Sequence, residues 1–214
     1  MKILELFAGT RSIGKAFEQR GHEVFSIEWD KRFENIDLYE DVQNVTAEMI
    51  LSKFGKPDVI WASPDCTTYS IAAISHHRRK EESGNLAPIS EYAKFCDRVN
   101  VHMLELIQTL QPTYFFIEKP RGGLRKMDFM QNIPRYTITY CQYGDERMKP
   151  TDIWTNHFSP EFKPMCKNGD PCHVSAPRGA KTGTQGLKNR IERSRIPTEV
   201  CEHIVSISER IKEQ

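Results

Sequence analysis

The sequence predicts an α/β domain with a mostly parallel central sheet. Short, nearly continuous apolar segments alternate with amphipathic segments through the first half of the chain. Strands that are buried on both faces give such apolar runs, and crossover helices give the amphipathic segments between them. The length of 214 residues suits one large domain with a small appendage.

The first strand and helix meet at a glycine turn. KILELF at 2–7 is typical of a strand, and the segment 11–21 has its apolar residues spaced for one helix face. Gly21 suits the left-handed position that ends many helices. EVFSIEW at 23–29 is predicted to be the second strand.

The alternation continues with a helix at 45–55, a strand at 58–63, a long amphipathic helix at 93–112 and a strand at 113–118. The long helix has apolar residues at Phe95, Val99, Leu106 and Leu110 among others. Two segments, YTITYCQY and DIWTN, are predicted to close the sheet.

The rest of the chain is poor in apolar residues until a terminal helix, EVCEHIVSISERI. Many Pro, Gly and Lys residues before that helix indicate a loop-rich insert. We therefore predict a core at 1–156, a small loop-rich insert at 157–187, and a C-terminal segment at 188–214 that packs back on the core.

Charge and composition exclude several classes of protein. Lys and Arg total 30 against 29 Asp and Glu, so a nucleic-acid partner would need a local basic patch. We see neither a signal peptide nor a run of about 18 apolar residues, so we expect no membrane span. The six cysteines are expected to be reduced thiols, which predicts a cytoplasmic protein.

The glycine turn, LELFAGTRSIG, is similar to a nucleotide-binding turn. Arg11 stands where a dinucleotide fingerprint has glycine, which disfavours a pyrophosphate but not a single nucleoside. Glu28 lies about 20 residues past Gly9, where an acid meets ribose hydroxyls in such folds. Asp41 is a candidate for an adenine amino group. A simple turn with a surface acid is the alternative.

Cys66 follows the third predicted strand in DVIWASPDCTTYS. It could be a packed core thiol, a metal ligand or a nucleophile. A metal is disfavoured because no partner lies within C-x-x-C spacing. The nucleophile reading gains from position, since ligands bind beyond the carboxyl ends of parallel strands and Pro64 would stiffen the turn.

Four segments, LELFAGTRSIGKAFE, SIEWD, ASPDCTTYS and FFIEKPRGG, resemble in order and separation the motifs of the DNA cytosine-5 methyltransferase family. RSRIPTEVCEHI resembles the closing motif of that family. The resemblance implies a Rossmann-like methyltransferase that moves a methyl group from S-adenosylmethionine to C5 of cytosine in DNA. The chain looks like a small, phage-like member with a very short target-recognition region.

The resemblance also implies catalytic roles. Cys66 would add to C6 of a cytosine flipped out of duplex DNA, and Glu118 would bond the ring edge at N3. Arg147, which matches loosely, would stabilise charge on O2 or orient Glu118.

For the cofactor, the resemblance implies that Phe7 packs on adenine, Glu28 holds the ribose and Asp41 contacts adenine. The predicted cofactor-binding residues are Phe7, Ala8, Gly9, Thr10, Glu28, Trp29, Asp41, Pro64 and Ser194.

The chain departs from the family pattern beside both catalytic residues. Asp65 replaces a proline, Thr67 a glutamine, and Lys119-Pro120 an Asn-Val pair. An acid beside a thiol disfavours the thiolate. We hypothesise that Lys119 pairs with Asp65 and offsets this effect.

Two further segments each allow more than one interpretation. SHHRRKEESGN at 75–85 is either a solvated loop or a loop that closes over substrate with Arg78 and Arg79 on phosphates. CKNGDPCH has three candidate ligands, Cys166, Cys172 and His173, without a standard zinc spacing. Because a fourth ligand, such as Cys141, would have to come from folding, we expect no metal.

Three alternative functions stay open at this stage. The chain could be a weak or inactive relative that binds cofactor or nucleic acid, or it could methylate RNA or a free pyrimidine nucleotide. A metal-dependent nuclease is disfavoured because adjacent strand residues, Glu118 and Lys119, face opposite ways. The short insert predicts relaxed specificity or help from a partner. The sequence does not define the oligomeric state.

Overall fold

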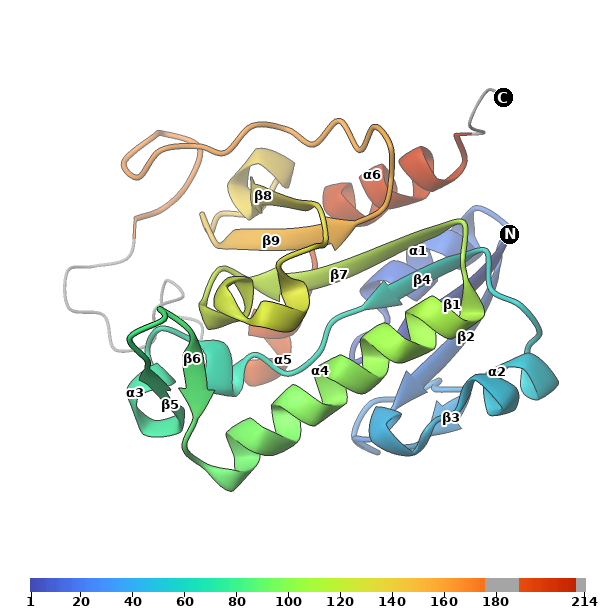
Figure 1. Cartoon of the computed structure of the whole chain (residues 1–214). Coiled ribbons are helices and arrows are strands. Elements are labelled where there is room, and N and C mark those ends of the chain that lie inside the picture. The colour runs from blue at the N-terminus through green and yellow to red at the C-terminus, as the bar shows by residue number, and fades with distance from the viewer. Residues whose placement is uncertain (176–188, 211–214) are drawn as a thin grey trace.

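The computed structural model describes residues 1–175 and 189–210. Seven strands form one sheet in the order β3-β2-β1-β4-β7-β9-β8 (Figure 1). Strands β1, β2, β3, β4 and β7 run parallel, whereas β9 is antiparallel to β7 and β8. Their bounds are Lys2–Leu6, Glu23–Glu28, Leu38–Tyr39, Val59–Ala62, Tyr114–Pro120, Arg135–Thr139 for β8 and Pro150–Thr155 for β9. The predicted mostly parallel α/β sheet is confirmed.

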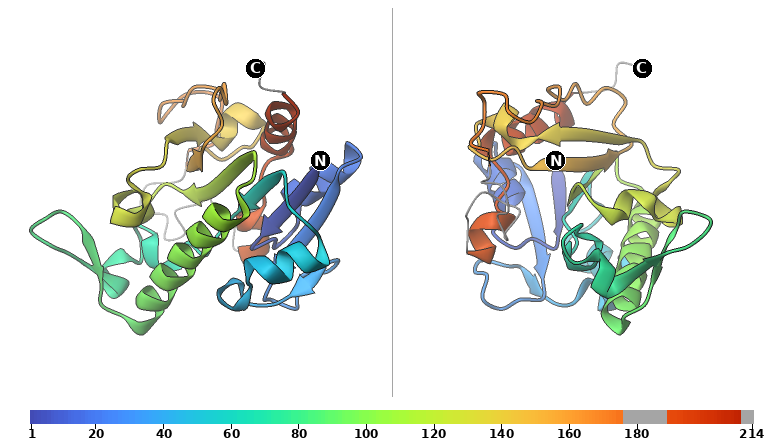
Figure 2. Two further views of the ribbon diagram at one scale, coloured as in Figure 1. Left: turned by 45° about the vertical axis from the view of Figure 1, so that its right-hand side comes forward. Right: turned by 90° about the vertical axis from the view of Figure 1, so that its left-hand side faces the viewer.

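Helices cover both faces of the sheet (Figure 2). One face carries α2 (Ala47–Lys53) and α4 (Glu91–Leu110), and the other carries α1 (Ser12–Gln19) and α6 (Thr198–Ser208). Side chains alternate across each strand, so Ile3 of β1 packs with α1 and α6 while Leu4 packs with α4. The sheet is therefore buried on both faces, which explains the continuous apolar strands.

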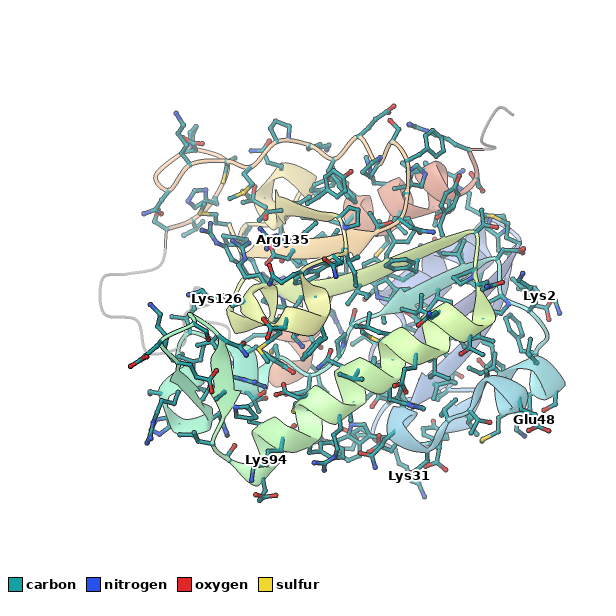
Figure 3. The ribbon with its side chains drawn as sticks, in the orientation of Figure 1. Lys2, Lys31, Glu48, Lys94, Lys126 and Arg135 are labelled. Atoms are coloured by element: carbon teal, nitrogen blue, oxygen red, sulfur yellow. The ribbon has the colours of Figure 1, made fainter. Side chains whose placement is uncertain are left out.

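The start of the long helix α4 is fixed by a capping side chain. Ser90 caps α4 by accepting a hydrogen bond from the Ala93 amide at 3.1 Å, so the helix begins two residues before the predicted start. Charged side chains project around the periphery, among them Lys31, Glu48 and Lys94 (Figure 3). Among the described helices, none combines the length and apolar character that a membrane span requires.

The charged segment at 75–85, which follows Cys66, forms a helix and a hairpin that the sequence did not predict. It contains α3 (Ile74–His77) and the hairpin of β5 (Arg78–Lys80) and β6 (Leu86–Pro88). Arg78 is buried, and its guanidinium donates to Asp97 at 2.6 Å and to the Thr68 carbonyl at 3.0 Å. The reading that placed Arg78 on phosphates is wrong, because this side chain holds the hairpin to α4.

The predicted strand YTITYCQY ends earlier in the structure than the sequence indicates. Strand β8 ends at Thr139, and the 3₁₀ helix η5 (Tyr140–Tyr143) follows it. Gly144, at φ 80°, ends this turn in the left-handed region that favours glycine. The turn directs the residues after β8 toward the same edge at which β7 ends.

Glu5 is an acid in the core, between β1 and α1. Its Oε1 accepts a hydrogen bond from the Gly14 amide at 3.0 Å, and Oε2 has no hydrogen-bond partner among the described residues. Burial raises the pKa of Glu5 from 4.5 to about 7. The protonated form is therefore favoured in the folded state.

We expect this acid to destabilise the fold as pH rises. The folded protein holds the proton between pH 4.5 and about 7 while the unfolded chain has lost it, so stability falls across that window. The loss attributable to Glu5 is about 3 kcal/mol. Urea unfolding of wild type and Glu5→Gln, compared from pH 4.5 to 8, measures it. A difference between the two proteins that does not change with pH would contradict this expectation.

Candidate active site

The predicted site residues lie where the parallel strands end at one edge of the sheet. The turn after β1 is tightly curved, with left-handed backbone at Phe7 (φ 57°), Gly9 (φ 49°) and Arg11 (φ 56°). The Gly9 amide donates to Glu28 Oε2 at 2.9 Å, and the Asp30 amide donates to Oε1 at 3.0 Å. The first turn is thereby tied to the acid at the end of β2.

The residues around Glu28 fit a nucleoside. Glu28 is buried, which raises its pKa, and each carboxylate oxygen keeps acceptor capacity for a hydroxyl donor. The neighbouring Trp29 is 65% exposed and offers an aromatic face. Asp41 starts the 3₁₀ helix η1 (Val42–Asn44), where Oδ1 accepts from the Gln43 amide at 2.9 Å.

Arg11 does not extend toward this site as a phosphate ligand would. Its side chain is buried and forms an ion pair with Glu18 on α1. The predicted absence of a dinucleotide pyrophosphate cradle agrees with this arrangement. The turn instead places the Gly9 main chain beside Glu28, between Ala8 and Thr10, while the Phe7 side chain is partly buried against the core.

Cys66 is exposed on the turn that follows β4. The turn continues into the 3₁₀ helix η2 (Thr67–Tyr69), in which Thr68 and Tyr69 are buried. A carboxylate oxygen of Asp65 accepts a hydrogen bond from the Thr67 amide at 2.7 Å. The acid before the cysteine therefore acts as a turn residue.

Lys119 fixes the main chain of the turn that carries Cys66. The amine is fully buried and donates hydrogen bonds to the main-chain carbonyls of Pro64 and Asp65. Burial lowers the pKa of Lys119, while Cys66, Asp65 and Glu118 raise it. The hypothesised pairing with Asp65 thus involves the main-chain carbonyl of that residue.

Gly122 explains the glycine pair after FFIEKPR. A Cβ at this position would lie 2.5 Å from the Tyr69 carbonyl oxygen. The chain leaving β7 therefore packs directly on the turn that carries Cys66, and a side chain at Gly122 would displace that turn.

Glu118 is 7% exposed and is held by Tyr140, whose hydroxyl donates to Oε1 at 3.0 Å. Burial and the Glu118 carboxylate raise the pKa of Tyr140. Lys149 completes the group, with its amine 4.6 Å from the centre of the Tyr140 ring. Burial lowers the pKa of Lys149, whereas Glu118 and Cys66 raise it. Because Ala62 at the end of β4 pairs with Ile117 of β7, the predicted nucleophile and acid come from neighbouring strands at the same edge.

Tyr140 and Lys149 are site residues that the sequence did not reveal. Tyr140 follows β8, and Lys149 lies immediately before β9. The antiparallel pairing of Thr139 with Pro150 brings Tyr140 and Lys149 to the edge of the sheet at which β7 ends. The only sequence signal was the position of Lys149 two residues past Arg147.

Arg147 and Ser194 have other partners than the resemblance implies. Arg147 is paired with Asp145, with a 2.8 Å bond from Nε to Oδ1, and its Nη1 is buried without a partner among the described residues. The hydrogen bond that orients Glu118 comes from the Tyr140 hydroxyl. Ser194 ends the helix α5 (Arg190–Ser194), which reaches the edge because Lys149 Nζ donates to the Arg193 carbonyl at 2.9 Å.

The pattern that describes the C-5 cytosine-specific DNA methylase family matches residues 1–134, more than half of the chain. The chain belongs to this family. As a member it is a DNA cytosine-5 methyltransferase that takes its methyl group from S-adenosylmethionine. The matched region contains Glu28, Cys66 and Glu118 but not Tyr140 or Lys149.

Relatives of this methyltransferase agree with the assignment. A probable DNA (cytosine-5)-methyltransferase of Frog virus 3 (isolate Goorha) is 29% identical over 221 residues, which cover 97% of this chain and all of that protein.

Solved structures share the fold. A putative DNA modification methyltransferase encoded within a prophage of E. coli matches 72% of this chain with TM-score 0.51 and 17% identity. A methyltransferase of Entamoeba histolytica matches 72% with TM-score 0.51 and 12% identity. The matches span 46% and 52% of those longer chains, so this methyltransferase corresponds to about half of each.

Proposed function

We propose that this methyltransferase modifies a cytosine flipped out of duplex DNA, through a transient covalent bond between Cys66 and the base. The main support is that an exposed cysteine and a buried acid, Cys66 and Glu118, lie at the ends of neighbouring strands, β4 and β7, which the Lys119 amine ties together. The nucleoside-binding features around Glu28 lie at the same edge of the sheet. This arrangement favours a flat base between thiol and acid.

The roles of the residues follow from the chemistry of cytosine, whose C5 is a weak nucleophile. When bound, S-adenosylmethionine supplies an electrophilic methyl group. The Cys66 thiolate forms a bond to C6, and the electron pair of the C5–C6 double bond moves to C5 while N3 receives a proton from Glu118. Later a base takes the C5 proton, the C5–C6 double bond re-forms as the C6–S bond breaks and releases the Cys66 thiolate, and N3 returns its proton to Glu118.

The neighbouring groups support these steps. Tyr140 orients Glu118 through the hydroxyl bond, and the Lys149 ammonium offsets negative charge that develops on the base. Lys119 fixes the thiol turn and stabilises the thiolate. The cofactor would be held by Glu28, Trp29 and Asp41 with the turn at 7–10. Base flipping and duplex binding, with 157–187 as recognition insert, belong to this proposal.

A trapping experiment tests the proposal. The full chain and labelled S-adenosylmethionine are incubated with duplex DNA, single-stranded RNA or dCMP. Each substrate is tested in unmodified form and in a form whose cytosine is replaced by 5-fluorocytosine. We expect label in unmodified duplex DNA and a stable protein–DNA adduct with the fluorinated duplex, because fluorine cannot leave as the C5 proton does. A binding-only relative would give neither product, and preferential labelling of RNA or dCMP would identify a different substrate.

Lys119→Met tests the support beneath the thiol. Removal of the amine leaves two carbonyls without their donor, at about 1–3 kcal/mol each, and removes a cation that favours the thiolate. We expect slower iodoacetamide alkylation of Cys66 at pH 7 and slower methylation. Lys94→Met, on the exposed face of α4, is the control. An alkylation rate equal to wild type would mean that Lys119 is only a structural residue.

A further inference from the structure

Four metal-binding side chains converge outside the active site. Cys141 comes from η5, and Cys166, Cys172 and His173 come from the segment that follows β9. One ligand atom from each lies within 4.8 Å of the others. Cys166 and Cys172 are separated by five residues, so no short motif predicted this group, and the fold supplies the fourth ligand.

The spacing of these atoms suits a tetrahedral ion. Zinc bonds of about 2.3 Å to sulfur and about 2.0 Å to nitrogen give S–S edges of about 3.8 Å and S–N edges of about 3.6 Å. Cys172 Sγ lies 3.6 Å from Cys141 Sγ and 3.6 Å from His173 Nδ1, and Cys166 Sγ lies 3.7 Å from that nitrogen. The pair Cys141–Cys166, at 3.1 Å, would open by about 0.7 Å on binding.

The surroundings of the cluster support ligation. Gln142 Nε2 donates to Cys172 Sγ at 3.4 Å, and the Cys166 amide is fixed by a 3.1 Å bond to Thr139 Oγ1. Nε2 of His173 is buried without a partner among the described residues, and Nδ1 faces the sulfurs. A disulfide would join two sulfurs and leave the third beside the imidazole, and all three cysteines are free thiols here.

The segment buries little apolar surface of its own, although Phe162 packs against the core and the Lys163 amide donates to the Tyr143 hydroxyl at 2.8 Å. Between 159 and 175 only Pro160 and Cys166 are buried, and the segment contains neither helix nor strand. Segments that bury so little apolar surface are commonly stabilised by a structural metal. A cross-link from Cys166, Cys172 and His173 to Cys141 would anchor this segment to η5.

We propose that Cys141, Cys166, Cys172 and His173 bind one Zn²⁺ ion. Three thiolates and one imidazole form a ligand set that favours zinc over harder divalent ions, and four protein ligands leave no open position for substrate. The ion is therefore structural. Because Cys141 adjoins Tyr140, the ion also fixes the turn from which Tyr140 reaches Glu118.

Metal analysis of the full chain tests the site. The protein is expressed with added zinc, purified without chelators, and its metal measured by plasma mass spectrometry. We expect one zinc per chain in wild type and in Cys201→Ala, whose sulfur is buried in α6 outside the cluster. Cys166→Ser and His173→Ala should lose most of the zinc, and cobalt substitution should give the visible absorption of tetrahedral thiolate coordination.

Two measurements keep the proposal testable if the variants fail to fold. Removal of zinc from wild type by a chelator should lower the melting temperature, and return of zinc should restore it. A folded wild-type protein without stoichiometric metal, whose melting temperature does not respond to zinc, would overturn the site. An intact mass lower by two hydrogens, with a peptide joining Cys141 to Cys166, would overturn it in favour of a disulfide.

Discussion

Cys66→Ser is expected to reduce methyl transfer to background, a loss on the order of 10⁶-fold if the thiol is the nucleophile. The hydroxyl is a much weaker nucleophile than a thiolate, and the amines of Lys119 and Lys149 cannot replace the bond to C6. The measurement is incorporation of labelled methyl into duplex DNA, together with adduct formation on duplex containing 5-fluorocytosine. We expect neither product from the variant.

The matched control is Cys201→Ala, which removes a buried sulfur on α6, in the core cluster that also contains Tyr140, and leaves Cys66 in place. It should retain the adduct. Cys66→Ser should bind S-adenosylmethionine as wild type does, because the residues around Glu28 are unchanged. An adduct that persists in Cys66→Ser would show that another group attacks the base.

Glu118→Gln is expected to slow methylation by about 10²- to 10⁴-fold, the range for loss of a positioned acid or base. The amide keeps the shape of the side chain and can still accept the Tyr140 hydrogen bond through its oxygen, but it cannot deliver a proton to N3. The rate of methyl transfer in a single turnover measures this step without product release.

Tyr140→Phe separates positioning from proton transfer. Loss of the 3.0 Å bond to Glu118 should slow the reaction by about 10-fold or more, at about 1.5 kcal/mol or more for a bond to a charged group. Equal rates for Glu118→Gln and wild type would exclude Glu118 as the acid. A Tyr140→Phe rate equal to wild type would limit that hydroxyl to a structural contact.

Much of the fold could be predicted because periodicity and sheet burial agree. Continuous apolar strands such as β4 and one-sided helices such as α6 have patterns that only a covered parallel sheet satisfies. The hairpin of β5 and β6 could not be predicted, since its stability comes from the buried contact of Arg78 with Asp97 rather than from apolar alternation.

The candidate site residues that could be predicted lie at or near the carboxyl ends of strands: Glu28 ends β2, Glu118 lies in the last part of β7, and Cys66 follows β4. Tyr140 and Lys149 could not be assigned, because the antiparallel return of β9 determines where they lie. For Lys119 the sequence predicted only a pairing with Asp65, not its hydrogen bonds to the main-chain carbonyls of the turn that carries Cys66. The cluster of three cysteines and one histidine depends on contacts between η5 and a distant loop, which spacing in the sequence does not encode.

The polarity of the sheet has a practical consequence for engineering this enzyme. Cys66, Glu118 and Tyr140 lie where β4, β7 and β8 end and Lys149 where β9 begins, all at one edge, whereas the turns at Gly21 and Gly55 precede strands at the other edge. A DNA-targeting module spliced into either glycine turn would meet the scaffold on the side remote from the chemistry. Such a graft would redirect the enzyme to a chosen locus while leaving its reaction centre intact.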